Sequence, residues 1–331
     1  MRHLLLIVCL AGCTRSADLG AGSDASPAGL DASIGPGADL AGSPFGPYDS
    51  DGGAAVQVVQ LQVQKGVLQT FNVDVYLPST TGPRPVVILA SGFFQKADAY
   101  APYARRLASH GVLTILRDDP NVTQPSSGVA DDISYLVNTW LGQSNSAGQL
   151  AGRIDIAKIG LAGHSRGGQA ALLAATGGAK GKVKAFFGID PVDSKPMFSV
   201  GNPVLARTDL PSIAIPTVFL GELTDKGGSG TPCAPEADNY AVLYGVAPSP
   251  SLAITAINAD HTDFQDQQSC FQCNQCTQGT ANPADVLAYS VRYLTAFFAR
   301  ELLADASVGP TLAGAGSALD VAATRIELTS K

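Results

Sequence analysis

The pattern with the clearest chemical meaning is the pentapeptide Gly-His-Ser-Arg-Gly at residues 163–167. A short apolar run at 159–162 precedes it, and a helical pattern at 169–175 follows it. Where a strand turns sharply into a helix, small neighbours leave room for a strained serine whose hydroxyl stands near the helix N-terminus. The pattern therefore predicts that Ser165 is a nucleophile for acyl chemistry. The alternative is a Gly-rich turn that carries a surface serine.

A serine hydroxyl is a poor nucleophile unless a base takes its proton, and elimination among the four histidines favours His261. His3 lies in a leader-like N-terminus, and His110 lies at an expected helix end, where capping explains it. His164 adjoins the nucleophile, so we expect its side chain to point away. His261 follows the nucleophile in the chain, as the base does in folds with this turn.

Two acidic positions compete to orient the base. Asp190 ends the apolar run that follows the nucleophile strand, and Asp225 comes shortly after the next run. An acid at either strand end would fix the tautomer of His261 and stabilise its imidazolium form. The chain order alone leaves Asp190 and Asp225 open, while turn formation accounts for Asp193.

The elements that must position these residues follow from the hydrophobic pattern. Two alternating segments, 56–63 and 71–77, predict strands joined by a turn at Lys65-Gly66. Short, nearly continuous apolar runs predict strands buried on both faces at 86–90, 112–116, 159–162, 183–189, 217–220 and 252–257. Helical patterns occur at 100–109, 130–141, 169–175, 238–244 and 284–303. The alternation predicts an α/β domain over 54–305, with a mostly parallel central sheet flanked by helices and a C-terminal tail at 306–331.

Six segments resemble chlorophyllases and, more loosely, platelet-activating-factor acetylhydrolases and bacterial polyester hydrolases. They are Ser91-Gly92-Phe93, 108–111, 163–168, 188–193, 233–236 and 261–264. The resemblance implies an α/β-hydrolase fold and a serine ester hydrolase that needs no cofactor and acts on a small-molecule or polymeric ester. Chlorophyllases take their acid from the first Asp of a matching Asp-Pro-Val segment, which implies Asp190. Polyester hydrolases would imply Asp225, but the segment Cys-Ala-Pro-Glu at 233–236 favours Asp190.

An oxyanion hole is expected from backbone N–H groups. The turn geometry assigns one donor to Arg166, and the resemblance assigns the second to Phe93. Chlorophyllases usually have His where this chain has Ser91. Two other functions stay open: an amidase or acyltransferase with the same site, and a non-catalytic, surface-anchored binding protein that kept the fold.

Four cysteines downstream of the N-terminus predict two disulfides. Cys233 stands alone, and Cys270, Cys273 and Cys276 form a Cys-x-x-Cys-x-x-Cys cluster. Because an exported chain meets an oxidising environment, we expect Cys233 to pair with one member of the cluster. A structural zinc site is the alternative, and we expect no metal.

The N-terminus predicts export. An apolar run at 4–10 is too short to span a bilayer, which takes about 20 residues, and it fits a signal peptide over 1–12. Leu-Ala-Gly-Cys at 10–13 resembles the lipobox of bacterial lipoproteins, which implies lipidation of Cys13 and a lipid anchor in the membrane of the bacterial cell envelope. A Gly/Ala/Ser/Asp/Pro-rich stretch at 13–53 predicts a flexible tether. A charged fraction of 15% and a net charge of −7 argue against nucleic-acid binding.

Overall fold

The computed structural model describes residues 43–118, 124–194, 204–226, 232–266, 273 and 275–331, all within the compact unit Asp39–Lys331. Within these ranges nine strands form a single sheet in the order β1-β2-β4-β3-β5-β6-β7-β8-β9. The strands are β1 (Val56–Lys65), β2 (Gln69–Pro78), β3 (Arg84–Ala90), β4 (Leu113–Arg117), β5 (Ile154–His164), β6 (Val183–Ile189), β7 (Thr217–Glu222), β8 (Ser251–Ala256) and β9 (Ile326–Ser330).

The centre of the sheet is parallel and its margins are antiparallel. Neighbouring strands from β4 through β8 pair in parallel, whereas β1 and β2, β2 and β4, and β8 and β9 pair antiparallel. The central strands consist almost entirely of buried residues, as expected for strands covered on both faces. The predicted class, a mostly parallel α/β-hydrolase sheet flanked by helices, is confirmed.

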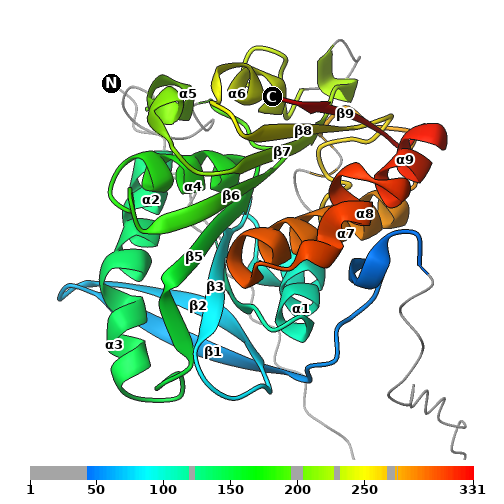
Figure 1. Ribbon diagram of the computed structural model, residues 1–331. Helices are drawn as coiled ribbons and strands as arrows, with labels where there is room; N and C mark the ends of the chain where they lie inside the picture. The colour runs from blue at the N-terminus through cyan, green and yellow to red at the C-terminus, as the bar shows by residue number, and fades with distance from the viewer. Residues whose placement is uncertain (1–42, 119–123, 195–203, 227–231, 267–272, 274) are drawn as a thin grey trace, which may run out of the picture. The chain divides into compact units, whose positions relative to one another are not determined.

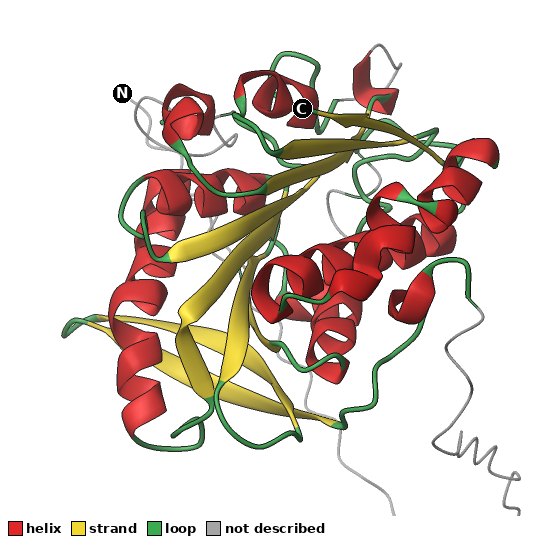
Figure 2. Ribbon diagram, in the orientation of Figure 1, coloured by secondary structure: helices red, strands yellow, loops and turns green. Residues whose placement is uncertain are grey.

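Helices cover both faces (Figures 1 and 2). One core cluster joins the sheet to α1 (Ala101–Ser109), α7 (Pro283–Leu303) and α8 (Gly309–Ala313). The other joins it to α2 (Ser126–Tyr135), α3 (Leu141–Ser146), α4 (Arg166–Thr176), α5 (Ala206–Asp209) and α6 (Tyr240–Val246). A π-helical turn, Leu136–Trp140, joins α2 to α3, so this helical stretch is longer than the predicted 130–141. No helix within the described ranges is long and apolar enough to cross a membrane.

The described domain extends past both predicted boundaries. Residues Gly46–Asp49 form a 3-10 helix with Tyr48 buried, so the structured part begins before residue 54. In the predicted tail, α9 (Ala315–Ala322) is followed by β9, which pairs along the length of β8. The pattern of five residues in β9 was too short to identify, because its strand character depends on pairing with β8.

The carboxyl ends of five strands meet at one edge of the sheet. Ser91 follows β3, Ser165 follows β5, Asp190 follows β6 and His261 lies shortly after β8. Glu222, the last residue of β7, lies at the same edge. Parallel strand order therefore gathers side chains that are distant in sequence, which is where open α/β sheets carry their sites.

Candidate active site

Ser165 occupies a strained turn between β5 and α4. Its backbone has φ 53° and ψ −125°, a left-handed conformation that is rare for a non-glycine residue. A Cβ at Gly163 would collide with the backbone of Gly167, and a Cβ at Gly167 would collide with the carbonyls of Ala90 and Ser91. The predicted need for glycine on both sides of Ser165 thus has a steric cause.

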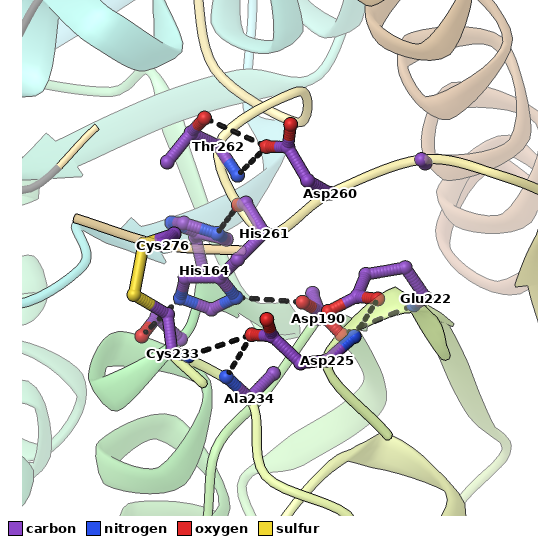
Figure 3. Close-up of polar contacts among 12 residues, drawn as sticks. His164, Asp190, Glu222, Asp225, Cys233, Ala234, Asp260, His261, Thr262 and Cys276 are labelled. Atoms are coloured by element: carbon purple, nitrogen blue, oxygen red, sulfur yellow. Dashed lines mark hydrogen bonds and ion pairs between the residues drawn. A yellow bond between two sulfur atoms is a disulfide. The ribbon is translucent and has the colours of Figure 1, made fainter. Parts of the chain in front are cut away.

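His261 links Ser165 to Asp190 through hydrogen bonds. Its Nε2 lies 2.9 Å from the Ser165 Oγ. Its Nδ1 lies 2.6 Å from the Asp190 Oδ2 (Figure 3). Both His261 and Asp190 are buried. The geometry allows the imidazole to take a proton from the hydroxyl at one nitrogen while a carboxylate holds the other.

Asp190 is held rigidly. Its φ of 37° is left-handed, its N–H donates to the Leu220 carbonyl at 2.6 Å, and its Oδ1 accepts from the Glu222 N–H at 3.3 Å. Burial raises the pKa of Asp190, and the adjacent His261 and the Glu222 N–H oppose that shift by favouring the ionised carboxyl.

The two residues predicted to line the oxyanion hole lie beside each other. The Arg166 guanidinium stands 5.0 Å from the centroid of the Phe93 ring. Arg166 is the first residue of α4, so its backbone N–H belongs to the helix N-terminus that directly follows Ser165. Phe93 precedes Phe94, a half-exposed residue with φ 58°.

The loop carrying His261 is shaped by its own side chains. Asp260 Oδ1 accepts from both the N–H and the hydroxyl of Thr262 at 2.8 Å, and its Oδ2 accepts from the Gly279 N–H at 2.9 Å. Asp263 Oδ2 accepts from the Asp260 N–H at 2.9 Å. Desolvation raises the pKa of Asp263 to about 6. These bonds flank His261 on both sides and fix the turn.

Asp225, the alternative acid, has other partners. Its Oδ2 accepts from the N–H groups of Cys233 (2.6 Å) and Ala234 (2.8 Å), as Figure 3 shows. No hydrogen bond joins Asp225 to His261 within the described residues. The carboxylate thus anchors the segment that begins at Cys233, a role the chain order alone did not indicate.

Glu222 is a site residue that the sequence analysis missed. It is fully buried, and its Oε2 accepts from the N–H groups of Thr224 and Asp225. Desolvation and the charges of Asp190 and Asp225 raise the pKa of Glu222 to about 9. The available signal was a glutamate at the buried end of a strand that is otherwise apolar.

Asp193 does more than form a turn, because it holds neighbouring elements together. It is fully buried, and it accepts hydrogen bonds from Gln169 Nε2 (3.0 Å), from the Ala206 N–H (2.7 Å) and from the Arg207 N–H (3.0 Å) and Nε (2.7 Å). Arg207 Nη2 also contacts the Asp238 Oδ1 at 2.5 Å. Asp193 therefore ties α4 and α5 together next to Asp190.

The predicted bridge from Cys233 to the cluster is present, and its partner is Cys276. Cys273 is also disulfide-bonded, whereas Cys270, the remaining member of the predicted set, lies outside the described residues. The described part of the chain contains no group of His, Cys, Asp and Glu arranged to hold a metal.

The remaining residues from the sequence analysis differ in where they lie. His110 caps α1 and contacts the Ser50 carbonyl at 3.1 Å. Cys13 and His3 fall in the range that is not described. His164 lies beside the site, where its ring contacts the His261 carbonyl and the Tyr100 hydroxyl.

Comparison with known proteins agrees with this architecture. The model of the chlorophyllase family matches residues 50–305, which carry the sheet up to β8 and all the residues of the site. Chlorophyllase-1 of Arabidopsis thaliana is 27% identical over 183 residues, which are 52% of this chain and 56% of that relative. The matched region thus spans just over half of the relative's length.

Proposed function

Because the chain belongs to the chlorophyllase family, whose activity is ester hydrolysis, we propose that it is a serine carboxylic ester hydrolase that works through an acyl-enzyme intermediate. The observation that carries this proposal is the continuous hydrogen-bond chain from the Ser165 Oγ through His261 to Asp190. The strained backbone of Ser165, just before a helix N-terminus, supports the same chemistry.

The proposed reaction has two halves. His261 Nε2 takes the proton as Ser165 Oγ attacks the ester carbonyl, and the backbone N–H groups of Phe93 and Arg166 stabilise the oxyanion. The imidazolium then protonates the departing alcohol, leaving an acyl-serine. In the second half His261 deprotonates a water, which attacks the acyl carbon, and the proton returns to Ser165 as the acid is released. Asp190 holds the imidazole tautomer throughout.

The same groups would serve an amidase or an acyltransferase, which differ in the leaving group or the acceptor rather than in the nucleophile. Product analysis with water and with alcohol acceptors separates these reactions. A non-catalytic binding protein is the third alternative, and covalent labelling of the wild-type chain by a fluorophosphonate would contradict it.

The decisive experiment combines a graded panel of esters with the Ser165→Ala variant. The panel runs from acetate to long acyl esters and includes a phytyl ester and a polyester. We expect hydrolysis by the wild type and the loss of many orders of magnitude in kcat in the variant, with unchanged thermal unfolding. Turnover close to wild type in S165A would overturn the proposal.

We also propose that the protein is exported and held in the bacterial cell envelope by a lipid on Cys13. The support is the lipobox-like segment 10–13 and the short apolar run before it. The disulfide between Cys233 and Cys276 is consistent with an oxidising compartment.

A further inference from the structure

A buried histidine connects the three loops that form the site. His164 Nε2 lies 3.0 Å from the His261 carbonyl, and His164 Nδ1 lies 2.7 Å from the Tyr100 hydroxyl. The same hydroxyl accepts from the Gly92 N–H at 3.1 Å. The chain of bonds thus runs from the loop after β3, through the serine turn, to the loop after β8.

The direction of each bond follows from its partners. The His261 carbonyl only accepts, so His164 Nε2 carries a proton. Complete burial, with the neighbouring His261 imidazole, lowers the pKa of His164 well below its ordinary value, and the ring is neutral. Its Nδ1 therefore accepts, and the Tyr100 hydroxyl donates to it.

The atoms around these hydrogen bonds are closely packed. A Cβ at Gly92 would lie 2.9 Å from His164 Nδ1 and 3.1 Å from the Tyr100 oxygen. The His164 ring also packs against the His261 ring, with centroids 4.7 Å apart. Gly92 is followed by Phe93, the predicted oxyanion donor. The side chains of Tyr100 and His164 therefore connect the loop that carries this donor to the loop that carries the base.

We propose that Tyr100 and His164 are positioning residues that set the distance between the His261 loop and the oxyanion loop at Gly92-Phe93. The inference rests on the proposed esterase function and deepens it. Reacting groups must be aligned closely, because a displacement of about 1 Å can cost roughly a hundredfold in rate. Neither side chain touches the Ser165 hydroxyl, so both act through the loops they hold.

Three variants test the proposal. Tyr100→Phe removes one oxygen atom, His164→Gln retains an N–H donor near the position of Nε2, and His164→Leu removes both polar contacts. Tyr293→Phe is the matched control, because it removes a buried hydroxyl that donates to Asp320 on α9, outside the site.

We expect Y100F to lower kcat for a short ester about tenfold and H164L about a hundredfold, with KM little changed. H164Q should retain more activity than H164L. The Y100F/H164L double variant should be no worse than H164L, because both changes break one chain of bonds. Y293F should keep the wild-type kcat.

A second measurement does not depend on activity. The proton between His261 Nδ1 and Asp190 should give a low-field resonance in the wild type and in Y293F, and Y100F should shift or broaden it. An unchanged resonance together with wild-type kcat in Y100F overturns the proposal, as does a loss confined to KM. Wild-type protein that hydrolyses no ester and resists fluorophosphonate refutes the proposed function instead, while the resonance still tests the positioning.

Discussion

The buried carboxyl groups of Asp190, Glu222 and Asp225 interact with one another at this edge of the sheet, and their hydrogen bonds separate their roles. Asp190 holds His261, Asp225 holds the N–H groups of Cys233 and Ala234, and Glu222 holds those of Thr224 and Asp225. Carboxyl groups this close cannot all ionise without cost. The raised pKa of Glu222, about 9, identifies the member that stays protonated at neutral pH.

Asp190→Asn should lower kcat roughly 10⁴-fold, because the amide no longer fixes the tautomer of His261. Asp225→Asn should have a much smaller effect on kcat, since Asp225 bonds backbone N–H groups rather than the imidazole. Steady-state kinetics of the two variants on one ester makes the comparison. If D225N lost its activity while D190N stayed active, the acid that orients His261 would be Asp225, as in polyester hydrolases.

Glu222→Gln should make stability less dependent on pH. Below the ordinary pKa of 4.5 the folded and unfolded chains both hold the Glu222 proton, so the shifted pKa does not change the free energy of unfolding there. As pH rises towards about 9, only the unfolded chain ionises, so wild-type stability falls by up to about 1.4 kcal/mol per pH unit. Urea unfolding at about pH 5 and about pH 8 should show an advantage of E222Q that grows with pH. An equal difference at both pH values would contradict the shift.

The individual residues differ in how far the sequence could predict them. Ser165 was identifiable from its glycine neighbours and His261 by elimination, but only the family resemblance separated Asp190 from Asp225. Glu222 left only one local signal, a glutamate at the end of an apolar strand. Tyr100 left none, because its contacts join loops that are distant in the chain. Whether the three predicted residues catalyse stays a prediction that the kinetics above will test.

Among the elements, the loop after β7 and the loop after β8 are fastened to each other. Asp225 holds Cys233, Cys233 is bonded to Cys276, and the nearby Gly279 N–H donates to Asp260, which adjoins His261. Gln278 Nε2 donates to the carbonyls of Cys273 and Cys276. The disulfide therefore connects the loop after β7 to the loop that carries the base.

Replacing Cys233 and Cys276 by Ser should destabilise the fold and slow catalysis. The bridge spans a sequence separation of 43, and the chain-entropy model gives about 4 kcal/mol for such a loop. Thermal unfolding should shift to lower temperature, and kcat should fall as the His261 loop loosens. Matched Ala substitutions at Ser79 and Ser146, which are both exposed, control for the number of substitutions. An unchanged kcat in the cysteine variant would show that the hydrogen bonds alone hold the His261 loop.

At the scale of the whole molecule, α7 joins the two ends of the described chain. Arg292 lies over the Phe45 ring at 3.7 Å, contacts Asp49 at 2.7 Å and contacts the buried Asp320 at 2.5 Å. This packing orders residues on both sides of the predicted range 54–305. The buried strands were predictable from composition, but the N-terminal segment and β9 are ordered by contacts that no local pattern records.

Cys13→Ser should release the protein from the membrane fraction without changing kcat. All the site residues named above lie within Asp39–Lys331, so we expect kcat not to depend on the proposed anchor. Fractionation of cells followed by an ester assay of both fractions measures both quantities. A variant that stays with the membrane would show that something other than Cys13 holds it there.

β1 is one margin of the sheet, and within the described residues no strand lies on its outer side. Strands at such a margin present unpaired amide and carbonyl groups that can template pairing with another chain. β1 also carries four exposed glutamines, at positions 57, 60, 62 and 64, and stacked amide side chains stabilise intermolecular cross-β order. The strand that ends the sheet on this side is thus open to pairing with another chain, so crowding or partial unfolding should favour association of molecules through β1.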